Sequence, residues 1–146
     1  MSGRVRGPPL LLLQGFVGDA RSTWRRQIDE LSDEFTVVAW DVPGAGRSSD
    51  PPASFRLPDY ADSLAGFVDT LGLGRVHLVG LSFGGALALE FYRRSPTTVM
   101  SLVLAGAYAG WVGSLPSDIA ESVWSKACGL RGFRRRSLLI GGTSLR

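Results

Sequence analysis

Apolar residues gather in four short runs along the chain, and each run stops at a polar or turn-forming residue. The runs are Leu10–Leu13, Phe35–Trp40, Arg75–Val79 and Ser101–Ala105. Gln14-Gly15, Asp41, Gly80 and Gly106 follow them in turn. Unbroken apolar runs of this length are typical of parallel strands that are covered on both faces. The pattern therefore predicts four strands of one sheet.

Amphipathic stretches lie between these runs and predict helices. Trp24–Leu31 has Ser22 or Thr23 as a candidate N-cap, and apolar residues recur at helical spacing from Tyr60 to Leu71 behind a candidate cap at Asp59. Phe83–Arg94 is apolar on most sides, as expected of a central helix. Alternating strands and helices predict an α/β fold with an open, mostly parallel sheet and flanking helices.

The strongest chemical signal is the pentapeptide Gly80-Leu81-Ser82-Phe83-Gly84, which has the form G-x-S-x-G. It follows a predicted strand and precedes a predicted helix, which is the context that a nucleophilic serine on a tight turn requires. The helix N-terminus beside it favours negative charge and offers free N–H groups to a developing oxyanion. The competing interpretation is a plain glycine-rich turn, which is common in α/β proteins.

Three segments together resemble the α/β-hydrolase family, in its serine-nucleophile branch. They are Leu10–Gly18 (LLLLQGFVG), Asp41–Ser48 (DVPGAGRS) and Val79–Gly85 (VGLSFGG), and the resemblance runs from about Leu10 to about Gly110. It implies a sheet in which the second strand lies beside the first, followed by the third and the fourth. It also implies that Ser82 is the nucleophile and that the backbone N–H groups of Phe16 and Phe83 form the oxyanion hole. The implied substrate is a small acyl compound such as an ester, thioester or lactone.

The sequence departs from the family pattern in three ways. Gln14 stands where the family usually has the histidine of the oxyanion loop. The only histidine, His77, lies within the strand that leads to Ser82, where we expect a packed or hydrogen-bonded side chain. Of the acids after Ser82, neither Glu90, Asp118 nor Glu121 is at a triad position. We therefore expect the N-terminal half of a serine hydrolase, truncated relative to the family and catalytically impaired.

An alternative hypothesis is a non-catalytic α/β domain. Such a domain would bind a small apolar ligand, or a partner chain through exposed sheet edges. The edges would be formed by the Phe35–Trp40 and Ser101–Ala105 strands, and they would also permit self-association. A third possibility is that a separately encoded chain supplies the acid and the histidine.

Charge and composition bear on the class of protein and on how the chain is divided. The 146 residues carry a net charge of +3, but every charge after Trp124 is positive, and the chain up to Trp124 has a net charge of −3. This distribution argues against a general nucleic-acid-binding protein. We expect a hydrolase-like core over residues 1–110, the start of a lid-like helical segment over 111–128, and a poorly ordered basic tail over 129–146.

The inventory of special residues is short. No apolar run approaches the ~20 residues of a membrane-spanning helix. The single cysteine, Cys128, excludes an internal disulfide, so we expect a cytoplasmic protein. One cysteine and one histidine, far apart in the chain, predict no metal site, and no cofactor motif is present.

Overall fold

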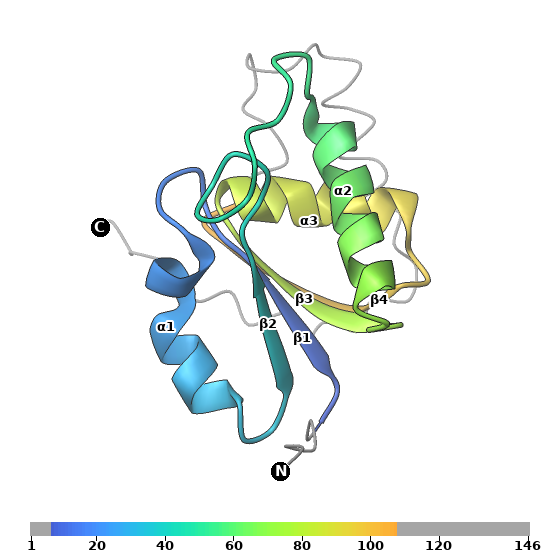
Figure 1. Ribbon diagram of the computed structural model, residues 1–146. Coiled ribbons are helices and arrows are strands. Elements are labelled where there is room, and N and C mark those ends of the chain that lie inside the picture. Colours follow the sequence, from blue (N-terminus) through green and yellow to red (C-terminus); the bar gives the residue numbers. More distant parts are fainter. Residues whose placement is uncertain (1–6, 108–146) are drawn as a thin grey trace, which may run out of the picture.

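The computed structural model describes residues 7–107, which form a three-layer α/β arrangement (Figure 1). Four strands and three helices alternate along this part of the chain. In chain order they are β1 (Pro9–Leu13), α1 (Ala20–Leu31), β2 (Thr36–Trp40), α2 (Leu57–Thr70), β3 (Val76–Leu81), α3 (Phe83–Arg94) and β4 (Val99–Ala105). The segments expected at 111–128 and 129–146 lie outside the described residues.

The strands form one parallel sheet in the order β2-β1-β3-β4, so the predicted strand order is confirmed. Because all strands run the same way, their carboxyl ends meet at one edge, at the top of Figure 1. The turn after β3 and the loops after β1 and β2 therefore lie close together at that edge. This is where an open parallel sheet places its ligand sites.

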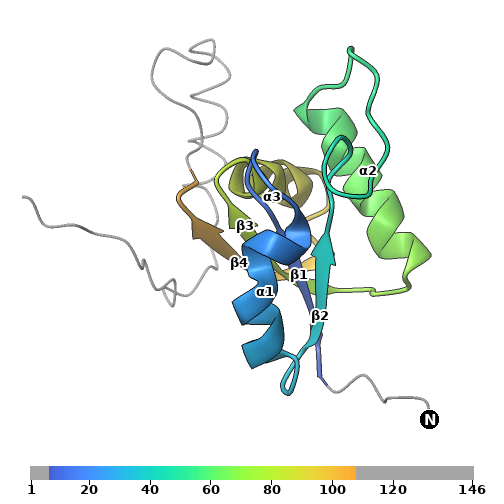
Figure 2. The same cartoon turned by 60° about the vertical axis from the view of Figure 1, so that its left-hand side comes forward.

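Helices cover both faces of the sheet, which explains the unbroken apolar runs. Helix α1 packs on one face, where Trp24 contacts the cluster that contains Leu10 and Leu12. Helices α2 and α3 pack on the other, with Leu64 and Phe91 in the larger cluster. Figure 2 shows α1 and α3 on opposite sides of the strands. The last four residues of β1 are therefore all buried.

Two predicted helix caps are wrong in detail, because the true caps lie one turn earlier in the chain. Asp19 caps α1: its carboxylate accepts the Ser22 backbone N–H at 2.6 Å, and the Ser22 hydroxyl accepts the Asp19 N–H. Ser22 thus completes a capping box instead of being the cap. Likewise, Asp59 lies inside the first turn of α2, where its carboxylate accepts the N–H of the N-cap residue, Arg56, at 2.6 Å.

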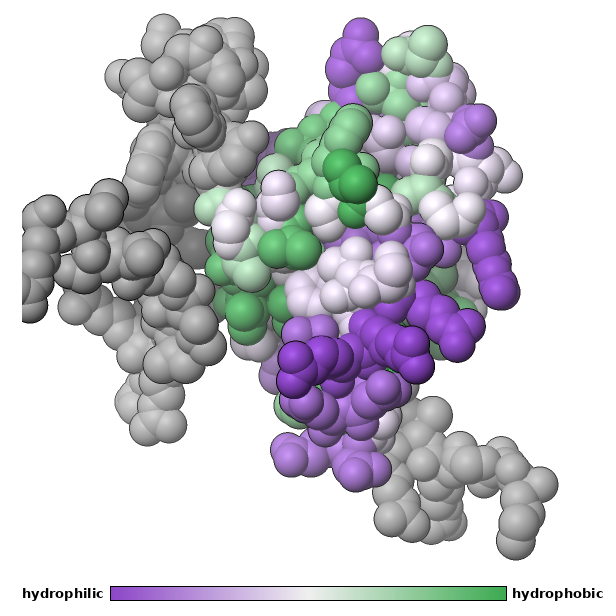
Figure 3. Space-filling model, turned by 90° about the vertical axis from the view of Figure 1, so that its left-hand side faces the viewer, coloured by the Kyte–Doolittle hydropathy of each residue, from purple (hydrophilic) through white to green (hydrophobic). Residues whose placement is uncertain are grey.

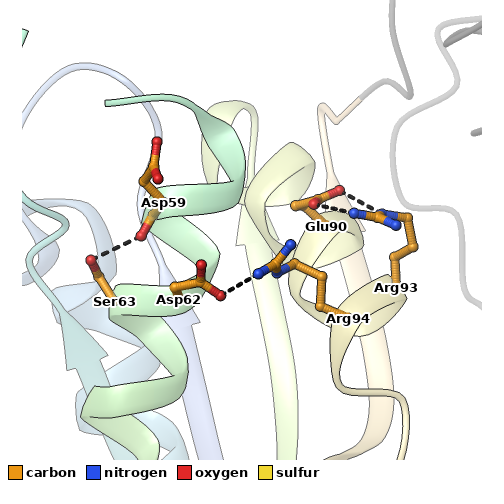
Figure 4. A network of polar contacts seen from close by, with 6 residues as sticks. All are labelled: Asp59, Asp62, Ser63, Glu90, Arg93 and Arg94. Carbon is orange, nitrogen blue, oxygen red and sulfur yellow. Dashed lines mark hydrogen bonds and ion pairs between the residues drawn. The ribbon is translucent and has the colours of Figure 1, made fainter. Parts of the chain in front are cut away.

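One ion pair connects α2 to α3, and a second lies within α3 (Figure 4). Arg94 of α3 donates to Asp62 of α2, and Arg93 makes a two-pronged contact with Glu90 at 2.9 and 2.6 Å. The Glu90 carboxylate raises the pKa of the Arg93 guanidinium by accepting its hydrogen bonds.

In the described part of the chain, no helix is long and apolar enough to cross a membrane.

Candidate active site

Ser82 stands at the turn between β3 and α3, in a backbone conformation that is costly for any residue except glycine. Its φ is 51° and its ψ is −113°, and it is the only non-glycine residue with positive φ among residues 7–107. Such a conformation costs about 1–3 kcal/mol, so the surrounding structure must hold it. The Ser82 N–H donates to the Ala105 carbonyl at 2.9 Å, and the Ser82 carbonyl accepts the Gly85 N–H at 2.9 Å. The side chain remains exposed above the sheet edge.

The glycines around Ser82 are required by close approach of backbone to backbone. A Cβ at Gly80 would lie 2.6 Å from the Gly85 Cα, and a Cβ at Gly84 would lie 2.7 Å from the Leu13 carbonyl carbon. Real Cβ atoms essentially never come that near, and backbone atoms cannot swing aside as a flexible side chain can. The structure therefore agrees with the steric reason for the predicted G-x-S-x-G turn. We call residues 80–84 the Ser82 turn.

The loop after β1, residues 14–19, lies directly against the Ser82 turn. A Cβ at Gly15 would be in ordinary contact with the Ser82 Cβ, at 3.7 Å. Gln14 is fully buried at the base of this loop, and its Nε2 donates to the Gly18 carbonyl at 2.9 Å. This hydrogen bond holds the two ends of the 14–19 loop together. Its Oε1 has no hydrogen-bond partner in the described part of the chain.

The backbone N–H groups of Phe16 and Phe83 belong to the two segments that meet at Ser82, the 14–19 loop and the start of α3. Within residues 7–107, neither the Phe16 nor the Phe83 N–H donates a hydrogen bond to another residue. The Phe83 N–H belongs to the first turn of α3, where the helix leaves its donors unpaired and carries a partial positive charge. The Phe16 and Phe83 rings are also in edge-to-face contact, with centroids 6.0 Å apart. The predicted residues Ser82, Phe16 and Phe83 are thus brought together.

Asp41 connects segments at the carboxyl edge of the sheet, a role that the sequence did not reveal. Its carboxylate accepts the Ala20 N–H at the start of α1 at 2.8 Å and the Arg47 N–H at 3.1 Å. Its carbonyl accepts the Ser48 hydroxyl at 2.5 Å. A side chain at Gly46 would overlap the Asp41 carboxylate, so the glycine is needed there. Asp41 therefore joins the loop after β2 to the start of α1, next to the 14–19 loop.

No histidine and no free acid stands beside Ser82 among residues 7–107. The His77 Nδ1 lies 2.7 Å from the Ser101 hydroxyl on β4, and its ring makes an edge contact with Phe35. This agrees with the expected hydrogen-bonded strand histidine. Glu90, whose side chain is 13% exposed, is paired with Arg93 of the same helix. Asp118 and Glu121 lie outside the described residues.

An open groove of about 490 Å³ lies between the loop after β2 and α2. Its lining includes Trp40, Pro43, Phe55, Ser63, Phe67 and Thr70. No residue of the Ser82 turn lines this groove, so it is not the place where Ser82 would act. In residues 7–107, no three His, Cys, Asp or Glu side chains gather as metal ligands would.

Comparison with known proteins identifies the class to which this fold and turn belong. Residues 8–130 match the family described as alpha/beta hydrolase fold, and the chain belongs to that family. It is 37% identical over 110 residues to a poly(3-hydroxyalkanoate) depolymerase of Ectopseudomonas oleovorans, covering 75% of this chain and 38% of that protein. It is 39% identical over 121 residues to a 2-hydroxy-6-oxo-2,4-heptadienoate hydrolase of Pseudomonas putida, covering 81% and 43%.

Solved structures show the same relationship. A thermophilic esterase from Thermogutta terrifontis superposes with a TM-score of 0.68 at 38% identity, covering 72% of this chain and 39% of that one. The chain thus spans less than half the length of the proteins it matches here. The similarity extends over the described sheet and helices, and the predicted family and fold class are confirmed.

Proposed function

We propose that this protein is a serine hydrolase acting on small acyl compounds such as esters, thioesters or lactones, with Ser82 as the nucleophile. The observation that carries the proposal is the strained, exposed Ser82 at a turn whose glycines admit no side chain. Strain of this kind persists where the surrounding structure enforces it, and it gathers at active sites. The relatives named as a depolymerase, a hydrolase and an esterase support the same reaction class.

In the proposed reaction the Ser82 Oγ attacks the acyl carbonyl carbon, and the carbonyl π electrons move onto the oxygen. The Phe16 and Phe83 N–H groups would then donate to this oxyanion. Removing a single donor of this kind costs about 10²–10³ in turnover. Collapse of the intermediate expels the alcohol, thiol or other leaving group, and water later releases the acid.

The serine proton needs an acceptor, and this requirement predicts a slow enzyme. The sequence has one histidine, and its ring is engaged with Ser101 inside the sheet. Loss of a triad member lowers turnover by roughly 10⁴–10⁶, leaving about 10³–10⁴ over the uncatalysed reaction from oxyanion binding and positioning. We propose this residual level for the 146-residue chain.

Hydrolysis of 4-nitrophenyl butyrate tests the proposal. The wild-type chain should exceed the uncatalysed reaction by about 10³–10⁴, because the oxyanion donors remain. The oxyanion donors also remain in Ser82→Ala, so the covalent intermediate, seen by intact-mass analysis, is the readout for the serine. The wild type and the exposed loop variant Ser54→Ala should carry one butyryl group on Ser82, and Ser82→Ala should carry none. A wild-type chain that hydrolyses the ester without gaining a butyryl group on Ser82 would remove Ser82 from the mechanism.

A second candidate is a non-catalytic domain that associates with a second copy through β4. The seven residues of β4 include no charged residue and no proline, and Val103 on this strand is 50% exposed. Natural edge strands are usually protected by such residues. Within residues 7–107, no strand pairs with the outer edge of β4. Light scattering after size exclusion should show a dimer that Val103→Lys converts to a monomer, and a wild type that is monomeric at all concentrations would contradict this candidate.

We also propose a cytoplasmic location. Proteins of oxidising compartments are often stabilised by disulfides, whereas cytosolic proteins rarely contain them. A chain with a single cysteine has no internal disulfide and fits the cytosolic pattern. Fractionation of cells that express the native gene would test this, and recovery in a secreted fraction would contradict it.

A further inference from the structure

A continuous row of aromatic rings leads away from Ser82. Phe16 contacts Phe83 edge to face, Phe83 contacts Tyr60 at 5.6 Å between centroids, and Tyr60 contacts Phe55 at 5.0 Å. These rings come from four separate places: the 14–19 loop, the start of α3, the first turn of α2 and the loop before α2. The fold therefore assembles this row at the carboxyl edge of the sheet, where Ser82 lies.

The row is accessible and apolar. The Phe16 side chain is 84% exposed and the neighbouring Val17 is 86% exposed, whereas Phe83 and Tyr60 are half-buried. Exposure of large apolar side chains costs free energy, and a contiguous apolar patch commonly marks a binding site. Figure 3 shows hydrophobic residues gathered around the upper part of this side, above the hydrophilic surface of α1.

The charged side chains of Arg56 and Asp59, which precede Tyr60 in the chain, hydrogen-bond within their own segment. The Arg56 guanidinium donates to the Ala53 and Phe55 carbonyls, and the Asp59 carboxylate accepts the Arg56 N–H. A ligand lying along Phe83 and Tyr60 would meet the surfaces of the two rings, whose centroids are 5.6 Å apart. An anionic or strongly polar acyl group would lose its hydration there without gaining a partner.

We propose that Phe16, Phe83 and Tyr60 form the wall that binds the acyl part of the substrate, and that this wall prefers an aromatic acyl group. The inference rests on the proposed function, because it takes Ser82 as the point where the acyl carbonyl is held. Phe83 follows Ser82 directly, and Phe16 follows Gly15, where an added Cβ would lie 3.7 Å from the Ser82 Cβ. A group attached to that carbonyl thus has the wall beside it. Edge-to-face aromatic pairs favour a ring over a saturated group of similar size by about two- to tenfold in affinity.

Equilibrium binding to the Ser82→Ala variant tests the wall without any chemistry. The probes are methyl phenylacetate and methyl cyclohexylacetate, which differ in the aromaticity of one six-membered ring. Titration followed by NMR should give a dissociation constant that is about two- to tenfold lower for the aromatic ester. Adding Phe16→Leu, which alters an exposed side chain and spares the core, should remove most of this preference, as should Tyr60→Leu.

Phe67→Leu is the matched control, because Phe67 packs on Trp40 in the groove between α2 and the loop after β2 and touches none of Phe16, Phe83 and Tyr60 through a ring contact; of the row, only Phe55 also lines this groove. It should keep the preference. Equal affinity for the two esters would overturn the proposal. So would a preference that survives Phe16→Leu and Tyr60→Leu but disappears in Phe67→Leu, since that result would place the ligand in the groove. No bond forms in Ser82→Ala, so this outcome is separable from the fate of the proposed serine chemistry.

Discussion

Replacing Gly84 by alanine should destabilise the protein, although glycine-to-alanine changes within helices normally stabilise. Gly84 is the second residue of α3, and its added Cβ would lie 2.7 Å from the Leu13 carbonyl carbon at the end of β1. Carbon atoms pack comfortably at about 3.5–4.0 Å, so α3 and β1 must separate by about 1 Å. Overpacking of this kind costs about 1–3 kcal/mol.

Gly66 supplies the matched control for this substitution. It lies within α2, and an added Cβ there meets nothing within 4 Å. Gly66→Ala should therefore gain up to about 1 kcal/mol from helix propensity alone. Because that gain applies to both substitutions, the difference between the two variants isolates the overlap, about 1–3 kcal/mol.

Urea unfolding followed by circular dichroism measures both variants. We expect the midpoint to fall for Gly84→Ala and to rise for Gly66→Ala, with similar slopes. Two variants of equal stability would refute the close approach of α3 to β1, and with it the steric account of the Ser82 turn.

Three further predictions concern the elements around the site. Asp41→Ala should lower the free energy of unfolding by about 1–3 kcal/mol, because the Ala20 N–H and a second backbone donor lose a charged acceptor; an unchanged urea midpoint would contradict this. Phe91→Ala should cost about 3–5 kcal/mol, since Phe91 is only 1% exposed, and a loss below 1 kcal/mol in urea unfolding would contradict its place in the core. The Ser22 backbone N–H lowers the pKa of Asp19 below its usual value, so the cap stabilises the fold above the unfolded-state pKa and is lost as pH falls through the folded one. The melting temperature of Asp19→Ala should thus lie below that of the wild type at pH 7 and converge with it in strong acid, and a difference independent of pH would contradict this.

Elements with a strong local pattern were predictable from the sequence. The leucine run of β1 and the G-x-S-x-G turn are each defined by a few adjacent residues, so both could be predicted locally. The strand order followed from the family resemblance. The cap of α1 was missed although its signal was present: Asp19 lies three residues before Ser22, the spacing of a reciprocal cap. A serine close to the helical residues is a plausible cap by itself, so residue type alone did not decide between them.

Contacts between distant segments were beyond the reach of local patterns. The carboxylate of Asp41 binds the start of α1, 21 residues earlier in the chain. Tyr60 reaches Phe83 only because α2 and α3 pack side by side on one face of the sheet. Such pairings depend on strand order and helix placement, which must be known before the partners can be named.

The central proposal is that the fold presents Ser82 as a nucleophile and that no proton acceptor stands beside it among residues 7–107. Reaction with a fluorophosphonate, followed by intact-mass analysis and peptide mapping, tests this most directly. We predict one adduct per chain, on Ser82, which forms slowly and is absent from Ser82→Ala. Added imidazole should accelerate it by accepting the Ser82 proton. A chain that gives no adduct with imidazole present, or adducts scattered over other serines, would contradict the account.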